Sequence, residues 1–135
     1  MAYKLIEIKG IGPIYAEKLA AEGLKTTDDF LEAAATKKGR NELEEKTGIA
    51  GGRILDWANM CDLFRIKGVA EDYSHLLEAS GVDTVKELRT RNAANLHAKM
   101  EEVNKEKGHV ERVPALSQVE NWIAQAKELK PKMTY

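Results

Sequence analysis

Apolar residues recur at three- and four-residue intervals through most of the chain, which is the spacing of amphipathic helices. Strict alternation of apolar and polar residues, the pattern of a half-buried strand, is nearly absent. In the first long apolar pattern, Ile14, Tyr15, Ala16 and Leu19 make the face predicted to be buried. Helices are predicted within residues 12–23, 26–35, 36–48, 51–68, 70–81, 83–91, 95–108 and 117–129, with one longer loop at 108–117.

Residues at the ends of these segments support their boundaries. Gly12 is a plausible N-cap with Pro13 at the first helical position, and Gly23 stands where a left-handed C-cap residue belongs. Capping boxes, in which an N-cap hydroxyl pairs with an acidic residue three positions later, are predicted at Thr26 with Asp29, Thr84 with Glu87, and Ser117 with Glu120.

The first segment, YKLIEIK, alternates and is compatible with a strand, but an internal repeat favours a helix. When Ile8 is aligned with Ile66, IKGIGPIYAEKLAAEGLKTTDDF lies over IKGVAEDYSHLLEASGVDTVKEL. LIEIK then overlies LFRIK, the tail of a predicted helix, so the first segment is predicted to be helical too. The chain is therefore predicted to hold two copies of a helical unit, residues 1–64 and 65–131, with a tail at 132–135.

A motif recurs at the start of both copies. The pattern hydrophobic-x-Gly-hydrophobic-Gly-x-x-x-Ala-x-x-Leu is filled by Ile8, Gly10, Ile11, Gly12, Ala16 and Leu19, and it resembles the helix-hairpin-helix motif. Nearly the whole chain is similar to an uncharacterised bacterial family of tandem helix-hairpin-helix proteins, catalogued only as a domain of unknown function. The resemblance implies an all-α fold in which two helix-hairpin-helix repeats pack as one compact helical domain.

The resemblance also implies that each hairpin touches a nucleic-acid phosphate. The first turn of a helix carries unpaired N–H groups and a partial positive charge, and glycine lets an anion approach the backbone closely. The binding residues expected at the first hairpin (residues 9–12) and its helix are Lys9, Gly10, Ile11, Gly12 and Lys18, with Ile11 filling the core beneath. Those expected at the second hairpin (residues 67–70) are Lys67, Gly68 and Val69. Such contacts would follow the backbone of double-stranded DNA and ignore its sequence.

A purely structural interpretation of the hairpins stays open, because a tight connection between helices needs glycine whether or not anything binds. In the second hairpin, Ala70 replaces the second glycine, and Glu71 and Asp72 follow, which would repel phosphate. In the first, Pro13 removes one N–H group. The alternative function is therefore a protein-interaction or scaffold module that kept the fold and lost phosphate binding.

The near-neutral overall charge, like the acidic second hairpin, favours this alternative. The chain has 21 basic and 22 acidic residues and a net charge of -1, so a basic surface requires local segregation of charge. Basic residues cluster at three further places, but acidic residues are interleaved with them, as on an ordinary solvated surface. The clusters are Lys37, Lys38 and Arg40; Lys86, Arg89 and Arg91; and Lys105, Lys107, His109 and Arg112.

Little in the sequence suggests an enzyme or a cofactor. His75, His97 and His109 share no metal-ligand spacing, and Cys61 falls on an apolar face with Trp57. A single cysteine cannot form an internal disulfide, and no signal peptide or membrane-spanning stretch is evident, so a cytoplasmic protein is expected. We expect a monomer, because a duplicated unit is its own pseudo-dimer, with DNA backbone or a protein as the partner.

Overall fold

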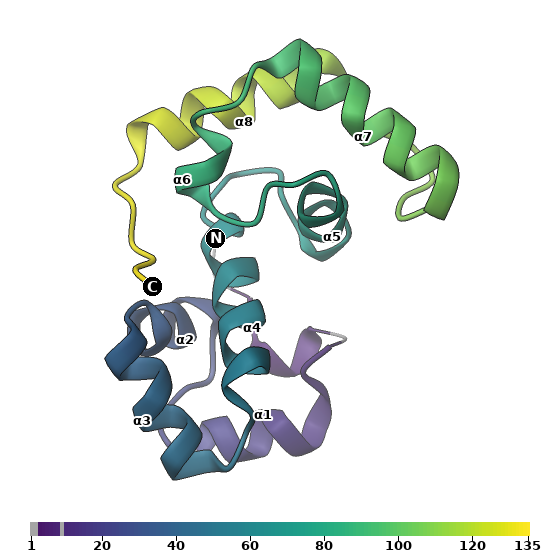
Figure 1. The fold of residues 1–135 in the computed structure, drawn as a ribbon. Coiled ribbons are helices and arrows are strands. Elements are labelled where there is room, and N and C mark those ends of the chain that lie inside the picture. The colour runs from purple at the N-terminus through teal and green to yellow at the C-terminus, as the bar shows by residue number, and fades with distance from the viewer. Residues whose placement is uncertain (1–2, 9) are drawn as a thin grey trace. The chain divides into compact units, whose positions relative to one another are not determined.

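The computed structural model describes residues 3–8 and 10–135 (Figure 1). Within these residues all regular structure is helical, apart from an isolated antiparallel bridge between Lys4 and Thr26. The predicted all-α class is confirmed. The elements are the 3-10 helix η1 (Leu5–Glu7) and the α-helices α1 (Gly12–Ala20), α2 (Thr27–Ala34), α3 (Lys37–Thr47), α4 (Gly51–Leu63), α5 (Glu71–Ala79), α6 (Val85–Leu88), α7 (Ala93–Lys107) and α8 (Leu116–Glu128).

The chain divides into two compact units. Unit 1 contains the residues up to Asp62 together with Lys132–Tyr135, and unit 2 contains Leu63–Pro131. The C-terminal residues therefore pack with the first half of the chain. The interpretation of the two halves as repeats of a single motif remains a prediction.

Unit 1 is organised around one face of α4. Trp57 is 5% exposed, and its ring meets the rings of Tyr15 and Phe30 edge-on, at centroid distances of 5.2 and 6.2 Å. Ile54, Trp57, Ala58 and Cys61, which recur at helical spacing along α4, are all buried. Burial raises the pKa of the Cys61 thiol, so this cysteine behaves as an apolar core residue.

The C-terminal residues close unit 1 through a buried arginine. Arg40 of α3 is only 7% exposed, and its guanidinium donates hydrogen bonds to the carbonyl oxygens of Ala34, Ala35 and Thr134. The Thr134 N–H donates to Ala35 in return, at 2.9 Å. The prediction that Arg40 belongs to an exposed basic cluster is therefore wrong, because this cation satisfies the carbonyl groups at the end of α2.

Unit 2 packs its short helices against two longer ones. In Figure 1 the green α7 and the yellow α8 lie side by side, and α5 contacts α7 while α6 contacts α8. Trp122 of α8 is 2% exposed, and its ring lies 5.3 Å from that of Tyr73. The predicted inward face of α7 is confirmed for Leu96 and Met100, which are buried.

Three helix starts depart from the predicted pattern. The N-cap of α1 is Ile11, and the predicted N-cap Gly12 is the first residue of the helix. The first segment is helical only as a single 3-10 turn, in which Leu5 and Ile8 point inward at the three-residue spacing of that helix and both are buried. Ser117 is not an N-cap, because α8 already begins at Leu116 and the Gln118 side chain accepts a hydrogen bond from the Ala115 N–H at 2.8 Å.

The face predicted for α1 is wrong at one position. Ala16 and Leu19 are buried, but Ile14 is 72% exposed. At 3.6 residues per turn, Ile14 lies about 160° around the helix from Ala16 and about 140° from Leu19, so it faces away from the buried stripe. An exposed isoleucine therefore stands beside the first hairpin.

The capping box at the start of α2 is confirmed and makes unit 1 sensitive to acid. The Thr26 hydroxyl accepts from the Asp29 N–H at 3.1 Å, and Asp29 Oδ2 accepts from the N–H groups of Lys25 and Thr26. These backbone hydrogen bonds, the one from Lys25 first, hold the pKa of Asp29 below its ordinary value.

Asp29→Asn is expected to flatten the acid dependence of stability. Because folding lowers the pKa of Asp29, its ionised form stabilises the native chain above about pH 4, and this contribution is lost as pH falls through the folded value. Urea unfolding between about pH 6 and pH 3 should therefore lose less free energy in the variant than in the parent chain. Asp28→Asn is the matched control, and an equal flattening by that control would contradict the assignment.

Among the residues that the structure describes, no helix combines the length and the apolar character needed to cross a membrane.

Candidate nucleic-acid interface

The first hairpin is an open corner of backbone between η1 and α1. Gly10 is exposed, whereas Ile11 is 2% exposed and fills the core beneath the turn. Gly12 has φ +67°, in the left-handed region, and a Cβ atom there would meet nothing within 4 Å. Lys9, which the sequence nominates as a binding residue, lies outside the described residues. The corner therefore offers its main chain without covering side chains at Gly12.

The backbone donors of this corner differ from those expected. The N–H groups of Ile11 and Gly12 both donate to the Ile8 carbonyl oxygen, at 3.0 and 3.3 Å, so they already have an acceptor. Among the described residues, the N–H groups of Gly10 and Ile14 have no hydrogen-bond acceptor. The donors available to an anion are therefore the Gly10 and Ile14 N–H groups, which lie before and after the paired N–H groups of Ile11 and Gly12.

Two cations belong to the helices around this corner, Lys18 to α1 and Arg53 to α4. Lys18 is exposed on α1 and stands one helical turn after Ile14, so it projects from the same face. Arg53 of α4 places its guanidinium carbon 5.4 Å from the centroid of the Tyr15 ring, and Tyr15 is the neighbour of Ile14. Sequence reasoning missed Arg53. The one hint in the sequence is that Arg53 precedes Trp57 by four residues, which places both on the same face of α4. Both side chains contact the ring of Tyr15.

The second hairpin is tied down by its own unit. Val69 is 1% exposed, as its counterpart Ile11 is buried in unit 1. The Gln125 side chain accepts from the Lys67 N–H at 2.8 Å and donates to the Lys67 carbonyl at 3.1 Å. Gly68 has φ +98°, and a Cβ atom there would lie 3.0 Å from Trp122 Nε1. The glycine at this position is therefore required by close packing and by the turn.

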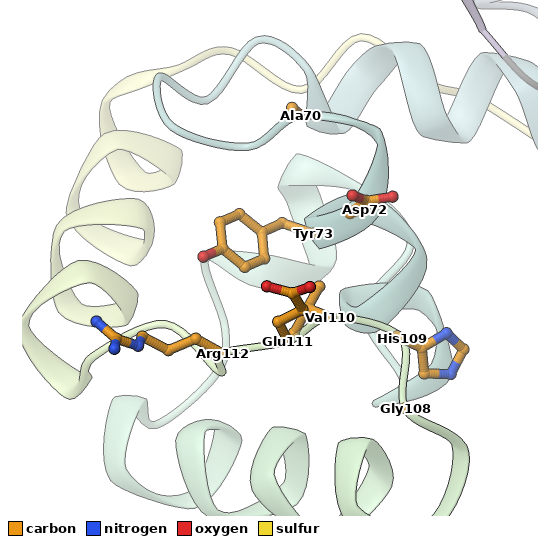
Figure 2. A pocket seen from close by; sticks show the side chains of 8 residues that line it. All are labelled: Ala70, Asp72, Tyr73, Gly108, His109, Val110, Glu111 and Arg112. Carbon is orange, nitrogen blue, oxygen red and sulfur yellow. The ribbon is translucent and has the colours of Figure 1, made fainter.

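The helix start beyond the second hairpin is acidic. Glu71 and Asp72 occupy the first turn of α5, whereas the first turn of α1 contains no acidic residue. A hollow of about 610 Å³ separates this helix start from the loop that follows α7, and Figure 2 shows Arg112 extending away from the carboxylates of Asp72 and Glu111. The helix start after the second hairpin is therefore acidic, and the one after the first is not.

The described part of the chain contains no group of three His, Cys, Asp or Glu side chains that could hold a metal ion. Two of the histidines pair with carboxylates one turn away, His75 with Glu71 at 3.6 Å and His97 with Glu101 at 3.0 Å.

Comparison with curated proteins and with solved structures gave no match. The profile of one protein family, described as "Domain of unknown function (DUF4332)", matches residues 9–129. The matched range includes both hairpins and the tryptophans packed beside them. Because this match covers most of the sequence, the chain belongs to the DUF4332 family.

Proposed function

We propose that the chain is a tandem helix-hairpin-helix module that binds the backbone of double-stranded DNA without sequence specificity and without catalysis. The observation that carries the proposal is the first hairpin: the N–H groups of Gly10 and Ile14 have no acceptor among the described residues, Lys18 is exposed one turn after Ile14, and Arg53 contacts the Tyr15 ring. The tandem assignment is supported by matching features of the two units: a buried Ile11 or Val69 after the first glycine, and a tyrosine packed on a tryptophan.

A phosphate group fits the first hairpin for electrostatic reasons. The start of α1 carries the positive end of the helix dipole, and no carboxylate in its first turn opposes an anion. Its oxygens can accept from the Gly10 and Ile14 N–H groups, while Lys18 and Arg53 balance the charge. All these contacts are to the sugar-phosphate backbone, so the proposed binding is blind to base sequence.

The second hairpin is assigned a minor part in binding. Glu71 and Asp72 oppose an anion there, and the Lys67 backbone is already held by Gln125. The proposed protein is a monomer with one strong backbone contact in unit 1. The bacterial cytoplasm is its proposed location, as the family resemblance implies.

Duplex affinity is expected to fall with salt in proportion to the few phosphates contacted. If Lys18 and Arg53 each neutralise one phosphate, the slope of log K against log salt is about −2, and affinity drops about tenfold between roughly 50 and 200 mM salt. A fluorescence anisotropy titration with a labelled duplex of mixed sequence measures both quantities. The double variant Lys18→Gln and Arg53→Gln should bring the slope close to zero.

Lys38→Gln is the matched control for that titration, because Lys38 is an exposed lysine of the same unit on α3. It should leave affinity and slope unchanged. Equal weakening by the control would show that binding follows net charge and not the hairpin. No binding at the lowest salt would overturn the proposed function.

A protein-interaction module is the second candidate, and one surface favours it. A groove of about 670 Å³ runs between η1 and α1, lined largely by apolar side chains such as Leu5, Ala16 and Leu24. Two large apolar side chains of the same elements are exposed: Ile6 at 58% and Ile14 at 72%. Exposed apolar surface of this kind marks protein contacts more often than nucleic-acid contacts. This function takes precedence if the duplex titration fails.

A further inference from the structure

Unit 2 has a polar hollow that the hairpins do not use. It has a volume of about 350 Å³ and lies where the chain passes from the end of α6 into the first turns of α7. Asn92 caps α7 by accepting from the Asn95 N–H at 3.0 Å. Among the described residues, the N–H groups of Ala93 and Ala94 have no acceptor, as expected for the first turn of a helix.

A buried hydroxyl in the wall of this hollow has no partner. Ser80 is only 4% exposed, and its Oγ makes no hydrogen bond. Its backbone N–H already donates to the carbonyl oxygens of Leu76 and Leu77, so the hydroxyl is the donor that Ser80 can offer to the hollow. An unpaired buried hydroxyl is unfavourable, and a ligand that accepts its hydrogen bond would remove that penalty.

Two cations line the hollow, and one of them, Arg91, is ion-paired with Glu87 at 2.6 Å. Arg91 and Lys99 line it, and no aspartate or glutamate is among its lining residues. One guanidinium nitrogen of Arg91 donates to the Gly81 carbonyl and to Glu87, which fixes the side chain, while its buried Nε has no partner. A second unsatisfied donor therefore accompanies the Ser80 hydroxyl.

The comparable hollow of unit 1 has a different lining. It lies between the end of α1 and α3, and its charged lining residues are Glu22, Glu42 and Lys46. In the repeat alignment Glu22 takes the place of Ser80. The positive lining in unit 2 is therefore not a requirement of the fold at this place.

We propose that this hollow binds a phosphate group. Ser80, Arg91 and Lys99 line the hollow with donor groups, two of them without a partner in the free protein, and the first-turn N–H groups of α7 follow its lining residue Asn92. The site lies in unit 2, away in sequence from the first hairpin, and does not rest on the proposed DNA contact there. The group is carried either by a small phosphate ester or by a polynucleotide backbone, which share this chemistry.

Inorganic phosphate is the probe that tests the site in the intact chain. At fixed ionic strength, adding phosphate should shift the backbone amide resonances of Ala93 and Ala94 saturably in two-dimensional NMR spectra. Lys99→Gln should weaken the binding about tenfold. Lys105→Gln, an exposed lysine further along the same helix, is the matched control and should leave it unchanged.

Ser80→Ala separates a binding role from a structural one. Because its hydroxyl has no partner in the free protein, the variant should unfold at the same urea concentration as the parent or at a higher one. It should nevertheless bind phosphate several-fold more weakly. Loss of stability without loss of phosphate affinity would overturn the assignment, as would the absence of saturable shifts at Ala93 and Ala94.

A short duplex in a second titration identifies the source of the phosphate group. If the duplex displaces phosphate from these amides, the site reads a polynucleotide backbone, and if both bind together it serves small phosphate esters. Lys18→Gln with Arg53→Gln should not change phosphate binding at this site. A failure of the proposal for the hollow can therefore be told apart from a failure of the proposed DNA contact at the first hairpin.

Discussion

Gly39→Ala is expected to lower the free energy of unfolding by about 3 kcal/mol, although alanine is the better helix former. Gly39 lies in the first turn of α3, where its N–H donates to the Thr36 hydroxyl at 3.1 Å. A Cβ atom there would overlap the backbone carbonyl oxygen of Ala33 in α2. That carbonyl cannot swing aside as a side chain would, so α2 and α3 must separate or the cap must break.

Gly52→Ala provides the matched control for this prediction. Gly52 is also a glycine near the start of a helix, but a Cβ atom there would meet nothing within 4 Å. Alanine should therefore stabilise the chain at that position, by roughly 0.5–1 kcal/mol at most. Urea unfolding followed by circular dichroism measures both changes. If the two variants shift the midpoint in the same direction, the close approach of α2 and α3 at Gly39 is wrong.

Local features of the fold could be predicted from the sequence because their partners are close along the chain. The Thr26 cap and its Asp29 partner are three residues apart, and Gly23, shortly after α1, has the predicted positive φ. Helical spacing likewise placed Ile54 and Trp57 in the core. Each of these depends on interactions within one or two turns of helix.

Features that depend on distant parts of the chain could not be predicted. Arg40 looks like a surface cation in its local sequence, and only the return of Thr134 to the end of α2 explains its burial. The sequence from Ser117 to Glu120 has the pattern of a capping box. The helix nevertheless begins at Leu116, and the Gln118 side chain accepts a hydrogen bond from the Ala115 N–H. In both cases a tertiary or competing local hydrogen bond overrides a pattern that is valid by itself.

The candidate site also combines features that the sequence predicts with features that it does not. The positions of Gly10, Ile11 and Gly12 follow from the motif, but the Ile8 carbonyl that occupies two of their N–H groups comes from the preceding turn. Arg53 reaches the site from α4 through Tyr15, and no linear pattern near the hairpin points to it. The electrostatic difference between the hairpins was visible in the sequence, because Glu71 and Asp72 are adjacent to the second turn.

Gly12→Glu is expected to weaken duplex binding by about tenfold to a hundredfold relative to Gly12→Gln. Both side chains have the same length and face the same strain at φ +67°, and neither meets a neighbour at its Cβ. The two variants therefore differ mainly in one negative charge beside the Ile14 N–H group. That charge both repels a phosphate and competes with it for the donor.

The comparison between the two variants, and not with the parent chain, carries the conclusion. Each loses some stability because a non-glycine residue is disfavoured at this φ, so equal urea midpoints must first be confirmed for the pair. Anisotropy titrations at low salt then isolate the effect of the charge. If the glutamate and glutamine variants bind duplex equally well, DNA does not approach the start of α1. In that case the exposed Ile14 and the apolar groove between η1 and α1 become the surface through which unit 1 acts.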